Sequence, residues 1–201
     1  GVNPDSCPTI FGTSTNDRLG CPDGDGDGWS DPDNGWIATS GADSFPADPT
    51  QWEDSDGDGY GDSTTGNSPD DCPSLAGQSN EDRLGCPDTD GDGWSDPDGN
   101  WGIADGADAI PDLASQQIDE DGDGFGDNSD GQNPDACVGE QGNSTIDRFG
   151  CVDSDGDGVS DEADIWDDDK TRWYDSDLDG IDDLLDDCVQ FPGTSYLDRI
   201  G

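Results

Sequence analysis

Apolar residues along this chain do not recur at the 3.6-residue spacing of an amphipathic helix. The segments between them consist largely of Pro, Gly, Ser and Asp, which favour turns and loops. Only the segment IDDLL, at 181–185, resembles a short helical turn. No apolar run is long enough to cross a bilayer. The pattern therefore predicts an irregular chain with little regular secondary structure.

The composition indicates that a conventional hydrophobic core is not to be expected. Hydrophobic residues make up 27% of the 201 positions, and 52 acidic against 6 basic side chains give a net charge of −46. Chains of this composition usually stay disordered unless something else orders them. A protein this acidic is repelled by phosphate, which excludes nucleic acid as a partner.

Almost all of the acid is Asp, since Glu occurs at only five positions. A solvating acidic surface, as in halophilic proteins, would be expected to use Glu freely. The short side chain of Asp instead suits the close packing of oxygens around a hard cation. Of these two interpretations, the composition favours cation binding.

Seven cysteines form three pairs with the same separation of 14 residues, and Cys188 is left over. Zinc is the competing interpretation, but the chain has neither His nor a CxxC motif. We therefore expect local disulfides, which indicate an oxidising, extracellular setting. The predicted pairs are Cys7 with Cys21, Cys72 with Cys86, and Cys137 with Cys151.

Internal repeats organise the whole sequence. The motif around the first cysteine of each pair recurs every 65 residues, as NPDSC, SPDDC and NPDAC, and the segments NDRLGC, EDRLGC and IDRFGC repeat in the same register. The third unit is shorter because it lacks two insertions, the first of which contains GWIATSG or WGIADG in the long units. We expect an elongated tandem repeat divided into long repeat 1 (1–65), long repeat 2 (66–130), short repeat 3 (131–181) and the start of a fourth repeat (182–201).

Each of the three units contains two copies of the motif D-x-D-x-D-G-x-x-D. Carboxylates at positions 1, 3 and 5 converge when the chain curls around a cation, and the glycine at position 6 permits the sharp turn. Position 7 supplies its backbone carbonyl and position 9 a further oxygen. We therefore expect six calcium loops that hold six to about twelve Ca²⁺ ions. The predicted ligands are Asp23, Asp25, Asp27, Trp29 and Asp31; Asp54, Asp56, Asp58, Tyr60 and Asp62; Asp88, Asp90, Asp92, Trp94 and Asp96; Asp119, Asp121, Asp123, Phe125 and Asp127; Asp153, Asp155, Asp157, Val159 and Asp161; and Asp175, Asp177, Asp179, Ile181 and Asp183.

A further acid at position 12 closes such a loop in an EF-hand. Asp164 and Asp186 occupy this position in the last two loops. In the four loops of the long repeats position 12 holds Asn, Thr, Gly or Asp, and we place the closing acid beyond the insertion instead. These predicted closing ligands are Asp43, Asp70, Asp108 and Asp135.

The stretch CPTIFGTSTNDRLGCPDGDGDGWSD resembles the prokaryotic form of thrombospondin type 3 repeats. EF-hands and dockerins also use such loops, but both require helices that these flanks do not predict. The resemblance covers essentially the whole chain, although the two insertions in each long repeat depart from it. It implies a calcium-organised rod or stalk on the cell surface, structural or adhesive, with no catalytic activity.

The aromatic and basic residues allow two interpretations. Side chains at position 7 are expected to pack between adjacent loops, whereas Trp36 and Trp101 in the insertions either pack or stack on a sugar or a neighbouring subunit. The arginines that follow Asp in each cysteine loop are expected to pair with carboxylates rather than to recognise a ligand. These arginines are Arg18, Arg83, Arg148 and Arg199.

An enzyme is not expected, because the chain has no His and a single Lys, which removes the usual bases. A pair of carboxylates as in a glycosidase would need one acid with a raised pKa, whereas these aspartates are expected to be ionised and metal-bound. Two functions stay open. One is an extracellular, calcium-loaded rod, stalk or filament whose partners are neighbouring repeats or subunits of the same protein. The other is a calcium-dependent adhesion module that binds carbohydrate or a protein partner through the Trp-containing insertions.

The cysteine motif that begins at Cys188 continues in register to Gly201, and its second cysteine would follow directly. Asp5, two residues before Cys7, likewise corresponds to the closing acid of an aspartate loop that would precede it in the chain. We therefore expect these residues to be a segment of a longer repetitive cell-surface chain. No signal peptide is present, and we expect any export signal to have been removed.

Overall fold

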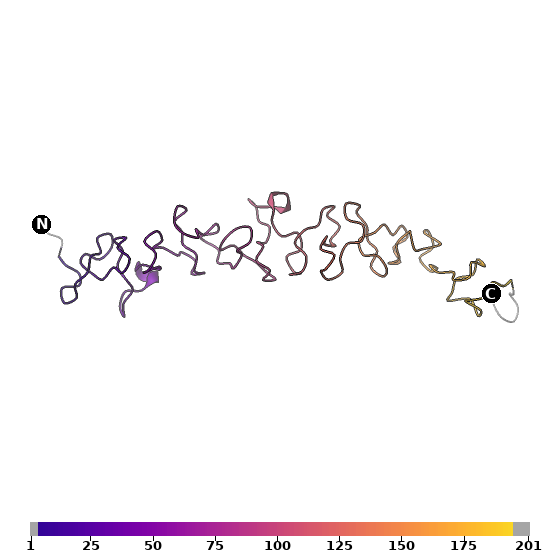
Figure 1. The fold of residues 1–201 in the computed structure, drawn as a ribbon, viewed down its shortest axis with the longest axis horizontal. Coiled ribbons are helices and arrows are strands. Elements are labelled where there is room, and N and C mark those ends of the chain that lie inside the picture. Colours follow the sequence, from indigo (N-terminus) through magenta and orange to yellow (C-terminus); the bar gives the residue numbers. More distant parts are fainter. Residues whose placement is uncertain (1–3, 195–201) are drawn as a thin grey trace. The chain divides into compact units, whose positions relative to one another are not determined.

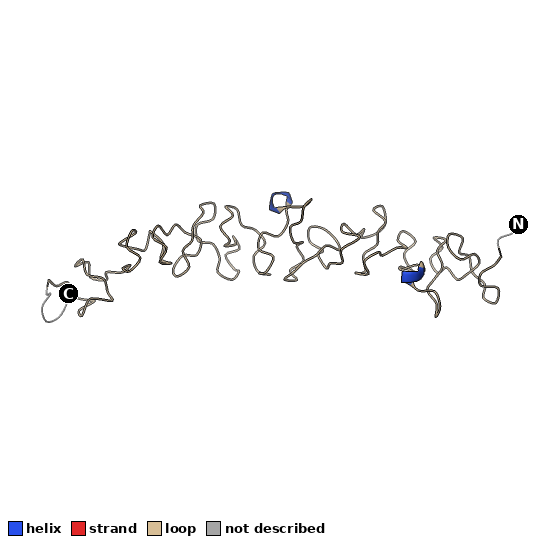
Figure 2. Ribbon diagram, turned by 180° about the vertical axis from the view of Figure 1, so that it is seen from behind, coloured by secondary structure: helices blue, strands red, loops and turns tan. Residues whose placement is uncertain are grey.

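The structure is a computed structural model that describes residues 4–194. Its helices are two single turns of 3₁₀ type, η1 (Ala38–Ser40) and η2 (Ile103–Asp105), and the remainder of the described chain is loop and turn (Figures 1 and 2). No strand forms between residues 4 and 194, where bridges occur only as isolated pairs. The prediction of an irregular, tandem chain is confirmed. Neither 3₁₀ turn was predicted, and both lie in the first insertion of a long repeat.

The chain divides into two compact units, Gly1–Pro111 and Asp112–Gly201. The first unit contains two of the disulfides and the three aspartate loops that begin before residue 111. The second contains the third disulfide and the other three loops. This division falls inside long repeat 2, so the compact units and the sequence repeats divide the chain differently. The repeat boundaries stay a prediction.

All three predicted disulfides are present, each with a Cα–Cα distance of 5.0 Å. The second cysteine of each pair is buried, and Cys188 is the one cysteine outside a disulfide. Within the described residues the buried apolar side chains number seven, against seventeen buried polar or charged ones. Apolar burial is therefore too sparse to hold the fold, and other interactions must organise it.

Each cysteine loop, the segment between two bonded cysteines, docks on the aspartate loop that follows it. The main-chain N–H groups of Thr15 and Asn16 both donate to the carbonyl oxygen of Gly28, at 2.7 and 2.8 Å. The buried Ser14 hydroxyl accepts the N–H of Cys21 at 2.9 Å. The same contacts recur around Ser79 and Ser144 in the other two cysteine loops. Backbone hydrogen bonds thus fix each cysteine loop to its neighbour without an apolar interface.

The second insertion of each long repeat is organised around a buried glutamine. Gln51 is 1% exposed, and its side-chain amide donates to the carbonyl oxygens of Ser63 and Asn67 while its oxygen accepts the N–H of Ser63. A Cβ atom added at Gly61 would lie 2.3 Å from the Gln51 amide, so only glycine permits this close approach. Gln116 occupies the same place in long repeat 2.

Candidate metal centres

The carboxylate at position 1 of each loop fixes the turn by accepting two main-chain N–H groups. In the first loop Asp23 accepts from Gly26 at 2.7 Å and from Gly28 at 3.2 Å. Both glycines have positive φ, 86° and 98°, a region that side chains with a Cβ disfavour. The same pair of hydrogen bonds forms in the loops that begin at Asp54, Asp88, Asp119, Asp153 and Asp175.

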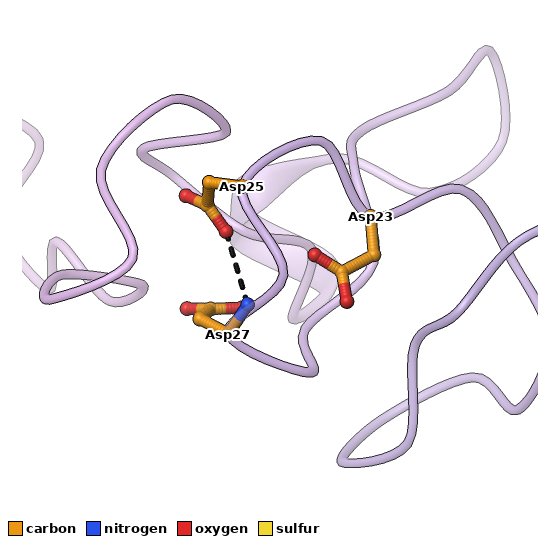
Figure 3. A group of neighbouring side chains, drawn as sticks. All are labelled: Asp23, Asp25 and Asp27. Carbon is orange, nitrogen blue, oxygen red and sulfur yellow. Dashed lines mark hydrogen bonds between the residues drawn. The ribbon is translucent and has the colours of Figure 1, made fainter.

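In the first loop the carboxylates at positions 3 and 5 each use one oxygen locally and leave the other inside the loop. Asp27 donates its N–H to Asp25 Oδ1 at 3.2 Å, and Trp29 donates its N–H to Asp27 Oδ1 at 2.8 Å. The Oδ2 atoms of Asp25 and Asp27 are buried and accept no hydrogen bond. In Figure 3 the carboxylates of Asp23, Asp25 and Asp27 are turned toward a common region within the loop.

Six groups of three acidic residues within the described chain could each hold a metal ion. In each group, one carboxylate oxygen from each residue lies within 4.8 Å of the others. Such a spacing between like charges is unfavourable unless a cation lies among them. Five of these groups are Asp23, Asp25 and Asp27; Asp54, Asp56 and Asp58; Asp88, Asp90 and Asp92; Asp119, Asp121 and Asp123; and Asp153, Asp155 and Asp157.

The aspartate at position 9 closes the first nine residues of each loop. The N–H of Asp31 donates to the Pro22 carbonyl oxygen at 2.8 Å, and its Oδ1 accepts the N–H of Gly24 at 2.8 Å. In four other loops a Ser or Thr at position 2 also donates its hydroxyl to this carboxylate. In the remaining loop the position 9 acid is Asp127 and position 2 is Glu120. The Oδ1 atom of Asp127 is buried and has no hydrogen-bond partner.

The predicted closing acids lie against their own loops in all six cases. Each donates its main-chain N–H to the carbonyl oxygen at position 8, at 2.8 to 3.0 Å, whatever the length of the intervening chain. Each also uses Oδ1 to accept the N–H two residues later, as Asp43 does from Phe45 at 2.7 Å. All six are buried, with exposed fractions of 1 to 8%: Asp43, Asp70, Asp108, Asp135, Asp164 and Asp186.

Three of the closing acids, Asp43, Asp70 and Asp108, are repelled by the aspartates at positions 3, 5 and 9 of their own loops. Burial, reinforced by the charges of Asp27, Asp25 and Asp31, raises the pKa of Asp43 to about 6. The pKa values of Asp70 and Asp108 are raised to about 6 for the same reasons, burial first and then the aspartates of their own loops. The Oδ2 atoms of all three accept no hydrogen bond. A cation in the loop would remove the repulsion and give these oxygens a ligand.

The sixth loop differs from the other five at position 4, where Leu178 replaces glycine. Its φ is +64°, in the left-handed region that costs a residue with a Cβ about 1–2 kcal/mol. The side chain is 79% exposed, so no packing compensates for this conformation. The hydrogen bonds from Leu178 and Gly180 to Asp175 still form, at 2.7 Å each. The loop geometry therefore persists without glycine at position 4.

At position 7, the side chains of Trp29, Phe125 and Val159 pack outside the loops. Trp29 stacks on Trp52 with ring centroids 6.2 Å apart, and Phe125 lies against Phe149 at 5.8 Å. Val159 is buried, with 1% of its surface exposed. The ligand role of the position 7 carbonyls, and of the closing acids, stays a prediction.

The tryptophans of the first insertions are engaged within the chain. The Trp36 indole N–H donates to Asp17 Oδ2 at 3.1 Å, and the Arg18 guanidinium lies 5.5 Å from the centre of the Trp36 ring. Arg18 also forms an ion pair with Asp33 at 2.8 Å. Trp101, Arg83, Asp82 and Asp98 repeat this arrangement in long repeat 2. Trp36 and Trp101 thus make contacts within the chain, and both are half-buried. Whether they also bind a ligand stays open.

Three of the four arginines that were predicted to pair with carboxylates do so. In addition to Arg18 and Arg83, Arg148 forms an ion pair with Glu162 in the short repeat, which has no inserted Trp. Arg199 lies outside the described residues. Arg18, Arg83 and Arg148 thus each tie a cysteine loop to the segment that follows the next aspartate loop.

No protein-family model matches this chain, and a search of curated proteins finds no relative. No helix in residues 4–194 has both the length and the apolar character needed to cross a membrane. What the sequence and structure establish is an aspartate-rich repeat with local disulfides and six groups of carboxylates suited to hold metal ions.

Proposed function

We propose that this chain is a calcium-stabilised structural module of the thrombospondin type 3 kind, part of an extracellular rod, stalk or filament. The observation that carries the proposal is the presence, in all six loops, of buried carboxylate oxygens that accept no hydrogen bond. Buried polar groups are normally hydrogen-bonded, and buried charges are normally paired or metal-bound. These oxygens belong to Asp25, Asp27 and Asp43; Asp56 and Asp70; Asp108; Asp121, Asp127 and Asp135; Asp155 and Asp157; and Asp177.

The donor set favours calcium over other metals. Every candidate ligand is an oxygen, and the chain has no His to suit zinc or copper. Calcium takes six to eight oxygens in flexible geometry, whereas magnesium requires a near-ideal octahedron and keeps several waters. A loop that offers five or more carboxylates and a backbone carbonyl suits the larger ion.

Calcium would also supply the stability that apolar burial does not. Six Ca²⁺ ions would cancel about 12 of the 46 net negative charges, and would do so where the carboxylates lie closest. Each disulfide closes a loop of about 15 residues, worth about 3 kcal/mol in the chain-entropy model. Metal binding and folding are then a single equilibrium.

The setting we propose is extracellular, because disulfides persist in oxidising compartments. Extracellular calcium modules bind at roughly 10⁻⁴ to 10⁻³ M, which the calcium of extracellular fluid or sea water can saturate. We propose no catalytic role, because the carboxylates that a hydrolase would use are the ones assigned here to calcium.

Metal analysis after equilibrium dialysis tests this function. The protein with its disulfides intact is dialysed against increasing calcium in the presence of excess magnesium, and the bound metals are counted. We expect at least six Ca²⁺ per chain, retained against magnesium. Binding of fewer than six, or displacement of calcium by an equal concentration of magnesium, would refute the proposal.

A further inference from the structure

The first compact unit contains a pocket beside the second carboxylate cluster, which contributes Asp54 to its lining. It has a volume of about 550 Å³ and opens to solvent. Trp29 and Trp52 line it together with the chain around η1, which contributes Ala38, Thr39 and Gly41. This volume lies within the range of small-ligand sites, roughly 300–1,000 Å³. The acidic side of the pocket is formed by Glu53 and Asp54.

The two indoles are parallel, with an interplanar angle of 5° and ring centroids 6.2 Å apart. Trp29 contributes only its side chain here, since its proposed role toward calcium uses the backbone carbonyl. The corresponding positions of long repeat 2 hold Trp94, Gln117 and Ile118 in place of Trp29, Trp52 and Glu53. The paired indoles and the adjacent acid are therefore specific to long repeat 1, and the periodic fold does not require them.

Three other tryptophans of the described chain, Trp36, Trp101 and Trp166, are each combined with a guanidinium and an acid. Arg18 lies over Trp36 and pairs with Asp33, and Arg83 lies over Trp101 and pairs with Asp98. In the short repeat Arg172 lies 3.8 Å from the centre of the Trp166 ring and 3.9 Å from Asp169. The pocket has the tryptophans and the acid of this combination, but no Lys or Arg lines it.

We propose that this pocket binds a guanidinium group carried by a protein partner. The planar guanidinium stacks on an indole face and pairs with a carboxylate at the same time. Asp54 is held by hydrogen bonds from Gly57 and Gly59, so the exposed Glu53 is the acid that meets the cation. Because the chain carries a net charge of −46, its field attracts cationic partners.

A neutral sugar is the competing ligand, since sugars also stack on tryptophan. It would make no use of the charge of Glu53 or of the acidic field. The two ligands are distinguished by probes of matched shape: N-acetyl-arginine methylamide, its uncharged analogue N-acetyl-citrulline methylamide, and a neutral oligosaccharide. Binding is followed through the indole N–H resonances of the full chain by NMR, at saturating calcium and physiological ionic strength.

The arginine probe is expected to shift the resonances of Trp29 and Trp52 and to bind more tightly than the citrulline probe. Trp52→Gln, which installs the residue of long repeat 2 and leaves the charge unchanged, should weaken arginine binding by about threefold to thirtyfold. Glu53→Gln should weaken it as well. As a control outside the pocket, Trp94→Gln in long repeat 2, at the position that corresponds to Trp29, should leave the affinity unchanged.

Equal binding of the arginine and citrulline probes would overturn the proposal, as would tighter binding of the oligosaccharide. Unaltered arginine binding in Trp52→Gln would also overturn it, by showing that the general negative field is responsible. The calcium count of each variant is measured in parallel. If the unaltered chain binds at least six calcium ions but no arginine probe, only the pocket proposal is refuted. If the unaltered chain binds fewer than six calcium ions, the calcium proposal is refuted.

Discussion

The main-chain N–H of Asp43 donates to the carbonyl oxygen of Ser30 at 2.9 Å, across the first insertion of long repeat 1. In the short repeat the same hydrogen bond joins Asp164 to Ser160, only four residues away. The closing acid therefore returns to one point of the loop whether or not an insertion precedes it. The insertions extend the chain outside the loop and leave its set of oxygens unchanged.

Replacing Asp43 tests whether its carboxylate, held against the first loop, is a ligand of the metal in that loop. Asp43→Asn keeps an oxygen to accept the Phe45 N–H but removes the charge, so calcium binding to the first loop should weaken by about tenfold or more. Isothermal titration calorimetry should then show one weak site among otherwise normal ones. Glu140→Gln removes the same charge from an exposed position and should leave every site unchanged.

Asp108→Asn should repeat the effect in long repeat 2, because Asp108 makes the same contacts there. Unchanged calcium stoichiometry and affinity in both closing-acid variants would show that the oxygen beyond the insertion is not a ligand.

Trp101 is predicted to stabilise the repeat rather than to bind sugar. Trp101→Phe removes the indole hydrogen bond to Asp82, 3.0 Å long, and keeps an aromatic ring beneath Arg83. The free energy of unfolding at saturating calcium should fall by about 1–2 kcal/mol, measured by urea titration. Normal stability combined with the loss of saccharide binding would instead support an adhesion role for this insertion.

Leu178 should be a point of strain in the sixth loop. Because its φ is positive and its side chain is largely exposed, Leu178→Gly should stabilise the calcium-loaded protein by about 1 kcal/mol. Urea titration at saturating calcium measures this gain. The matched reverse change, Gly26→Leu in the first loop, should destabilise by a similar amount. A loss of stability in Leu178→Gly would mean that Leu178 makes contacts that outweigh its conformation.

The features that follow from local spacing could be predicted from the sequence. The carboxylates at positions 1, 3 and 5 converge because a nine-residue turn leaves them few alternatives, and cysteines 14 residues apart meet across one loop. The closing acids were located because the repeats can be aligned across their insertions.

Contacts between residues that lie far apart in the sequence could not be predicted. From the sequence alone, a glutamine such as Gln51 is expected at the surface. In the structure it is buried, because Gly61 and Gly66 approach its side chain closely. The pairing of Trp29 with Trp52 depends on how two successive loops pack, which no local motif records. The same holds for the indole hydrogen bond of Trp36 to Asp17, 19 residues earlier.

Removal of calcium tests the central claim most directly, namely that the metal holds the carboxylate loops together. Circular dichroism and hydrodynamic radius are measured on the disulfide-intact chain at saturating calcium, after excess EDTA, and after calcium is restored. The account predicts that chelation expands the protein to a disordered chain looped only by its disulfides, and that calcium reverses this change. A spectrum and radius unaltered by EDTA would contradict it.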